Sequence, residues 1–148
     1  MNLNEEVELL KGVPIFSKIE PAKLKLLAFT SERLNVAGGQ EVCHQGDLGD
    51  AMYVILGGTA DVLIDTPGGQ IAVAEMKKNS FFGEIAILCD VPRTATIKAR
   101  ESLATLKISK DMFYRLVAEF PQMAVEIMRE LAHRLEDTNQ KLRAATKA

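Results

Sequence analysis

Short stretches in which apolar and polar residues alternate, separated by turns rich in glycine, are the feature that most restricts the fold. Leu34 and Val36 alternate with polar neighbours, and the segment 52–56 is apolar throughout. Pro67-Gly68-Gly69 is typical of a hairpin turn. We expect strands at about 32–36, 41–45, 52–56, 60–65, 71–76, 94–99 and 103–108. Short strands at this spacing favour a closed or sandwiched antiparallel sheet.

Helical patterns flank the expected strands. The segment 3–11 carries acidic residues in its first turn, and Pro21 stands at a first-turn position of a second helix, 21–30. After the strands, 110–119 has one apolar face, and Pro121 begins a last helix that runs to about residue 144. We therefore expect one domain, 1–148, with N-terminal helices in 1–30, the strands in 31–109 and two C-terminal helices in 110–148.

The last helix carries an apolar seam whose members are spaced alternately by four and three residues. The seam consists of Ala124, Met128, Leu131, Leu135, Thr138 and Leu142. This heptad spacing favours a parallel helix pair in a homodimer. The alternative is a helix that packs on its own chain, as we expect for its N-terminal half through Ile127.

Composition excludes several classes of protein. The net charge is −2, so no basic surface argues for nucleic acid binding. Cys43 and Cys89 are the two cysteines, and without a secretion signal they suggest a reducing compartment and no disulfide framework. No apolar run approaches the length of a membrane span. We therefore expect a soluble, cytoplasmic domain.

The stretch from Phe81 to Thr96, FFGEIAILCDVPRTAT, concentrates groups that bind anions. Gly83 permits close backbone approach, and the five residues after it form a helical turn whose first N–H groups suit an anion. Arg93 brings a planar fork of donors that suits phosphate oxygens. Glu84 would repel a phosphate, so it fits better as an acceptor from sugar hydroxyls. Together Glu84 and Arg93 indicate a nucleotide monophosphate site; the alternative is a surface ion pair worth about 0–1 kcal/mol.

This stretch resembles the phosphate-binding cassette of the cyclic nucleotide-binding domain family. That family includes the catabolite activator regulators of bacteria, the regulatory subunits of cyclic nucleotide-dependent kinases and cyclic nucleotide-gated channels. The matching strings are F-G-E-I-A-I-L and P-R-T-A-T, with the usual spacing between Glu84 and Arg93. A preceding G-D-x-x-x-x-x-Y-x-I-x-x-G pattern also matches, at Gly46, Asp47, Tyr53, Ile55 and Gly58. The resemblance covers nearly the whole chain, whose short length favours a stand-alone bacterial member.

The resemblance implies an α+β, mainly β fold, in which an eight-stranded antiparallel jelly-roll barrel is flanked by N-terminal helices and two C-terminal helices. It implies a 3′,5′-cyclic purine nucleotide as ligand, with no cofactor, no metal and no catalysis. Glu84 would accept from the ribose 2′-hydroxyl, and Arg93 would clamp the cyclic phosphate. The residues expected to bind the ligand are Phe82, Gly83, Glu84, Ile85, Ala86, Arg93, Thr94, Ala95 and Arg134.

The resemblance also implies a lid and a relay. The final helix would cover the base, and Arg134 lies where some channel domains carry an arginine that contacts the base. A solvated helix charge is the alternative for Arg134, and Leu131 and Thr138 are nearby candidates. Thr94, after the arginine, accompanies guanine recognition in some members, yet we favour cAMP over cGMP. The ligand would pull 110–119 and the last helix towards the barrel about a pivot at Phe120-Pro121.

Four alternatives to a stand-alone sensor remain open. A transcription factor needs a reader helix after the long helix, and we expect no DNA-binding domain in this chain. A metal-dependent cupin needs clustered ligands, whereas His44 and His133 are far apart. A barrel that has lost its nucleotide is disfavoured by the presence of Glu84 and Arg93. The chain also fits a regulatory domain of a larger channel, kinase or transcription regulator, and its effector is unknown.

Overall fold

The computed structural model describes residues 2–146. Within this part of the chain, the elements are α1 (Leu3–Lys11), η1 (Pro14–Phe16), α2 (Pro21–Thr30), β1 (Glu32–Val36), β2 (Glu41–Cys43), β3 (Ala51–Gly57), β4 (Ala60–Thr66), β5 (Gly69–Met76), β6 (Phe81–Phe82), α3 (Glu84–Cys89), β7 (Thr96–Ala99), β8 (Leu103–Ser109), α4 (Lys110–Glu119) and α5 (Pro121–Thr146). The four long helices and the seven strands that the sequence predicts are all present. The predicted strands 41–45 and 94–99 are shorter in the structure, because β2 ends at Cys43 and β7 begins at Thr96.

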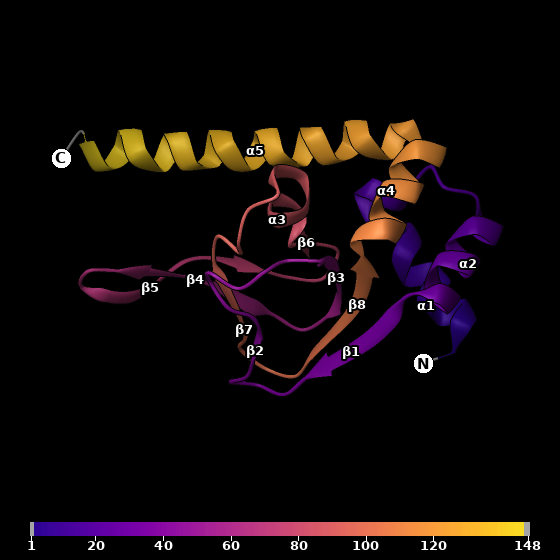
Figure 1. Ribbon diagram of the computed structural model, residues 1–148, viewed down its shortest axis with the longest axis horizontal. Helices are drawn as coiled ribbons and strands as arrows, with labels where there is room; N and C mark the ends of the chain where they lie inside the picture. The colour runs from indigo at the N-terminus through magenta and orange to yellow at the C-terminus, as the bar shows by residue number, and fades with distance from the viewer. Residues whose placement is uncertain (1, 147–148) are drawn as a thin grey trace.

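The strands form two four-stranded sheets in which each pairing is antiparallel. Their orders are β1-β8-β3-β6 and β2-β7-β4-β5. Figure 1 shows the helices gathered beside the first sheet, with α5 crossing over the cassette. A mainly β fold with flanking helices is therefore confirmed, and closure of the sheets into one jelly-roll barrel stays a prediction. The eighth strand, β6, has two residues and is too short to show alternation in the sequence.

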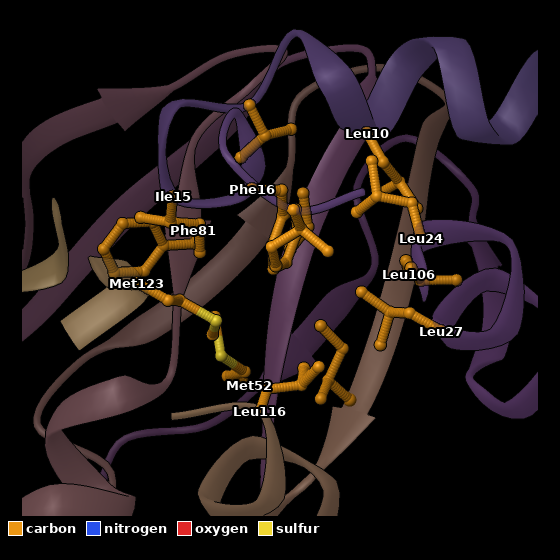
Figure 2. Packing of buried hydrophobic residues seen from close by; sticks show 14 of the residues in the cluster. Leu10, Ile15, Phe16, Leu24, Leu27, Met52, Phe81, Leu106, Leu116 and Met123 are labelled. Atoms are coloured by element: carbon orange, nitrogen blue, oxygen red, sulfur yellow. The ribbon is translucent and has the colours of Figure 1, made fainter. Parts of the chain in front are cut away.

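The strand β3 is apolar throughout because both of its faces are covered. Successive side chains of a strand point to opposite faces. Met52 and Val54 belong to the cluster between the first sheet and the helices, whereas Tyr53 and Ile55 belong to the cluster between the two sheets. Figure 2 shows Met52 near Leu116 of α4 and Met123 of α5. The strand β3 therefore contributes side chains to both clusters, the one between the first sheet and the helices and the one between the two sheets.

The short helix η1 was missed by the sequence analysis, which predicts helices at 3–11 and 21–30 and no element between them. Pro14 stands at its first position, where the fixed φ of proline suits a helical turn. The turn closes with hydrogen bonds from the Phe16 N–H to the Val13 carbonyl (2.9 Å) and from the Ile19 N–H to the Phe16 carbonyl (3.1 Å). It buries Ile15 and Phe16 against α5 and the first sheet, so it is part of the core.

The helices α4 and α5 meet at Phe120-Pro121. The Ser109 hydroxyl caps α4 by accepting from the Met112 N–H at 3.2 Å. Along α5, Met123 and Ile127 are buried, whereas Leu135 and Leu142 are 62% and 59% exposed. Figure 1 shows the second half of α5 continuing beyond α3, above the β4–β5 hairpin. No helix within residues 2–146 combines the length and the apolar character of a membrane span.

We predict that Phe16→Ala lowers the free energy of unfolding by about 3–5 kcal/mol, because it removes a fully buried ring from the helical core. The matched control is Phe29→Ala in α2, where the ring is 78% exposed. That change is expected to cost less than about 0.5 kcal/mol. Chemical denaturation of the two variants checks this, and equal losses would show that η1 does not belong to the core.

Candidate functional site

The cassette is shaped by a glycine between β6 and α3. Gly83 has a φ of 93°, in the left-handed region that favours glycine. A Cβ at this position would also lie 2.5 Å from Nη1 of Arg93 and 2.9 Å from the Ala51 carbonyl oxygen. The six-residue helix α3 follows directly and ends at Cys89, and Asp90, with a φ of 52°, caps its C-terminus. The predicted helical turn after Gly83 is therefore confirmed.

The guanidinium of Arg93 is buried beside β3. Its Nη2 donates to the Ala51 carbonyl at 2.7 Å and its Nη1 donates to the Gly83 carbonyl at 3.2 Å. The group lies 5.8 Å from the centroid of the Tyr53 ring. Among residues 2–146, no carboxylate lies within ion-pair distance of it. A buried cation without a counter-ion carries a desolvation cost that a bound anion would offset.

A second glycine fits against Arg93 from the loop between β2 and β3. A Cβ on Gly49 would lie 2.5 Å from Cβ of Ala86 and 2.9 Å from Cζ and Nε of Arg93. The same loop holds the main chain of Arg93, whose N–H donates to the Asp47 carbonyl at 2.7 Å. The sequence analysis does not single out Gly49. Gly49 and Asp50 repeat the preceding Gly46-Asp47 pair, and this repeat is the signal of Gly49 in the sequence. The close approach of Gly49 to Arg93 depends on tertiary structure.

Glu84 pairs with the last helix. Its Oε1 accepts from Nη1 of Arg134 at 2.9 Å, and the Glu84 side chain is 2% exposed. A surface ion pair between Glu84 and Arg93 is therefore wrong: both side chains are buried, and Glu84 has another partner. Burial raises the pKa of the Glu84 carboxyl above its usual value, and Arg134, with a smaller effect from Arg93, opposes that rise.

These groups border a cavity of about 130 Å³ between the cassette, α5 and the second sheet. Every residue predicted to bind the ligand lines it, namely Phe82, Gly83, Glu84, Ile85, Ala86, Arg93, Thr94, Ala95 and Arg134. The sequence analysis missed the apolar wall opposite the cassette, formed by Cys43, Val62, Met76 and Ile97. Alternation predicts that such residues face inward, but it does not tell which of them reach the cavity.

The two other residues considered for contact with a base do not line the cavity. Leu131 packs against the helical core, and the Thr138 hydroxyl donates to the Arg134 carbonyl one turn earlier, at 2.9 Å. Burial raises the pKa of the Cys43 thiol, so this group contributes to the wall as a neutral, largely apolar surface. Within the described residues, no three His, Cys, Asp or Glu side chains gather in a way that could hold a metal.

The fold and the site define a class of protein: a ligand-binding domain whose pocket combines a buried cation, a buried carboxylate and an apolar wall. The model of the cyclic nucleotide-binding domain family matches residues 33–120, which include both sheets and the cassette. The chain belongs to the cyclic nucleotide-binding domain family.

The relatives come from different branches of this family. A cAMP-dependent protein kinase regulatory subunit of Blastocladiella emersonii is 38% identical over 109 residues, covering 73% of this chain and 27% of that protein. A cyclic nucleotide-gated potassium channel of Mesorhizobium japonicum is 30% identical over 125 residues, covering 84% of this chain and 33% of the channel. The catabolite activator protein of Thermus thermophilus superposes with a TM-score of 0.79 at 25% identity, over 90% of this chain and 63% of that one.

Proposed function

We propose that this domain is a sensor that binds cAMP, in preference to cGMP, in the cavity beneath α5. The observation that carries the proposal is the Arg93 guanidinium, which is buried beside the cavity without a carboxylate partner among the described residues. Two of its five N–H donors bond to main-chain carbonyls. The remaining donors suit the single negative charge of a cyclic phosphate.

The other roles follow the resemblance between this cassette and that of the family. Arg93 clamps the cyclic phosphate with Thr94 and Ala95 alongside, and Glu84 accepts from the ribose 2′-hydroxyl. Gly83, Ile85 and Ala86 supply main-chain donors near the phosphate and the ribose. Phe82 and the apolar wall supply the surface for the uncharged parts of the nucleotide. The chemistry of the cavity lining supports this arrangement.

The preference for cAMP is supported by the relatives. The Blastocladiella emersonii relative is a regulatory subunit of a cAMP-dependent protein kinase, and the Thermus thermophilus structure is a catabolite activator protein. Thr94 lines the cavity and is exposed, so its hydroxyl is available to either purine. Since this chain spans 27% of that kinase subunit and 33% of the Mesorhizobium japonicum channel, the activity of the whole protein is a separate question.

Isothermal titration with cAMP and cGMP in parallel tests the proposal. We expect Arg93→Ala to weaken cAMP binding at least tenfold, in line with the roughly 2–5 kcal/mol that loss of a buried charged partner costs. Arg93→Lys keeps the charge but not the fork, and it is expected to bind with intermediate affinity. Arg115→Ala, at an exposed position of α4, is the control. Undiminished binding by folded Arg93→Ala, or a tenfold preference for cGMP, would contradict the proposal.

We further propose that the bound nucleotide shifts the positions of α4 and α5. Two contacts support this relay: the Tyr114 hydroxyl of α4 donates to the Ile87 carbonyl of α3 at 3.1 Å, and the Lys110 N–H donates to the Asp50 carbonyl at 2.8 Å. A ligand that changes the cassette therefore acts directly on α4, and Phe120-Pro121 is the pivot to α5. It shifts the equilibrium only by its difference in affinity for the two states.

Hydrogen exchange followed by mass spectrometry checks the relay. Adding saturating cAMP is expected to slow exchange in α3 and to change it in α4 and α5, while α2 serves as an internal control. Tyr114→Phe, which removes the hydroxyl that bonds α3, is expected to reduce the change in α4. Protection confined to the cassette would show that the nucleotide binds without a relay.

We also propose that two copies pair through the second half of α5. The heptad seam supports this, because Leu135 and Leu142 are exposed and nothing in the described chain covers them. Sedimentation equilibrium is expected to give a dimer mass, and Leu135→Glu with Leu142→Glu to give the monomer. Gln140→Glu adds one negative charge to the same half of the helix, away from the seam, and is expected to leave the dimer intact. A wild-type chain that stays monomeric at every concentration would contradict the pairing.

Two settings stay open for this chain: a stand-alone sensor, or a regulatory domain of a larger channel, kinase or transcription regulator. The partner that receives the signal is therefore open as well. The single-domain organisation of the chain, its cytoplasmic location and its lack of catalysis also stay predictions.

A further inference from the structure

A second cavity lies between η1, the N-terminal half of α5 and the turn that joins β5 to β6. Its volume is about 350 Å³, within the range of about 300–1,000 Å³ that is typical of small-molecule sites. It shares no lining residue with the nucleotide cavity. Phe82 lines the nucleotide cavity and Phe81 lines the second one, because successive side chains of β6 point to opposite faces. We call the second one the turn-helix cavity.

The turn of residues 77–80 is a rigid wall of the turn-helix cavity. Two hydrogen bonds fix it to β3: the Asn79 N–H donates to the Ile55 carbonyl at 3.0 Å, and the Ile55 N–H donates to the Ser80 carbonyl at 2.9 Å. The side chains of Lys78, Asn79 and Ser80 line the cavity and have no hydrogen-bond or ion-pair partner among residues 2–146. This wall therefore offers an ammonium, an amide and a hydroxyl to a ligand.

The facing wall is one side of α5. Nη1 of Arg129 donates to Oε1 of Glu126 at 3.2 Å, which leaves its Nε and Nη2 without a partner in the described part of the chain. His133, one turn later, also has no side-chain partner there. Oε1 of Glu130 accepts from Nε of Arg134 at 3.2 Å, so each carboxylate of this wall already faces an arginine. The groups that remain for a ligand are mainly donors.

The floor of the turn-helix cavity is apolar. Ile15 and Phe81 are each 2% exposed, and Figure 2 shows them close together. Pro14 borders them from the start of η1. A ligand in this cavity would therefore meet hydrogen-bond donors on two sides and an apolar surface beneath it.

We infer that the turn-helix cavity is a second ligand site, which binds a small organic phosphate. The phosphate lies between Lys78 of the turn and Arg129 and His133 of α5, and the organic part lies on the floor. Lys78 has no carboxylate within ion-pair distance among the described residues. An anion supplies the missing counter-charge, and phosphate oxygens accept from several donors at once. A cationic ligand would compete with arginines for carboxylates that are already engaged.

The turn-helix cavity adjoins a side chain that lines the nucleotide cavity. The guanidinium of Arg134 lies 4.7 Å from the centroid of the Phe81 ring and donates to Glu130. A phosphate that bridges the turn and α5 therefore favours the position of α5 over the cassette. This consequence rests on the proposed function: cAMP and the phosphate should strengthen each other's binding, because coupling between two sites is reciprocal.

Phenyl phosphate, titrated into the isotopically labelled full chain and followed by NMR, tests the site. The titration uses about 0.15 M salt, where the Debye length is about 8 Å. We expect saturable shifts at residues 78–80 and 129–133. Lys78→Gln and Arg129→Gln should each weaken binding about fivefold, the upper range for an exposed ion pair. Lys77→Gln is the control, because Lys77 pairs with Glu75 and does not line the cavity.

Two further titrations separate the sources of an effect. Inorganic phosphate has no apolar part to place on the floor, so it should bind about fivefold more weakly than phenyl phosphate. Because Arg93 would also attract a phosphate, phenyl phosphate is titrated again with saturating cAMP and with Arg93→Ala. Shifts at residues 78–80 should persist in both, and saturating cAMP should raise the affinity for phenyl phosphate about fivefold.

The possible results distinguish the new site from the proposed function. Shifts that are confined to residues 83–95 and vanish in Arg93→Ala would overturn the site while the proposed function stands. Equal effects of Lys77→Gln and Lys78→Gln would overturn it as well. An affinity for phenyl phosphate that cAMP does not raise would overturn the coupling alone. A wild type that binds phenyl phosphate at the turn but does not bind cAMP would overturn the proposed function and leave the site.

Discussion

The burial of the Arg93 guanidinium is the constraint on which the cassette depends. It draws together the Ala51 carbonyl of β3, the Gly83 carbonyl and the ring of Tyr53, while the loop before β3 holds its main chain. Glycine is required on two sides of it, at Gly49 and Gly83, because a Cβ would collide with the guanidinium. These carbonyls do not neutralise the positive charge of Arg93. The packing that orders the cassette therefore leaves a buried charge that a bound anion would neutralise.

The fold could be predicted largely from the sequence because its signals are local. Alternation such as that of Leu34 and Val36, the turn at Pro67-Gly68 and proline at the start of two helices each report on a few neighbouring residues. Two elements escaped for physical reasons. The strand β6 is too short to alternate, and η1 is specified by the burial of Phe16 in a core assembled from distant segments.

The candidate site could be predicted as a set of residues but not as a set of contacts. The cassette strings identify Glu84 and Arg93 as two members of a nucleotide site, with a surface ion pair between them as the alternative. In the structure Glu84 instead pairs with Arg134, across 50 residues, and Arg93 is held by main-chain carbonyls. Periodicity within one element cannot predict such partners, because the choice depends on how α5 crosses α3.

The length of α5 bears on the proposed relay. Its first turns are fixed by the buried Met123 and Ile127, while Arg134 lies 13 residues and Thr146 lies 25 residues from Pro121. At a rise of 1.5 Å per residue these positions are about 20 and 38 Å along the axis. In the proposed relay α5 would act as a lever with its fulcrum near Pro121, and a displacement at Arg134 would be nearly doubled at the far end.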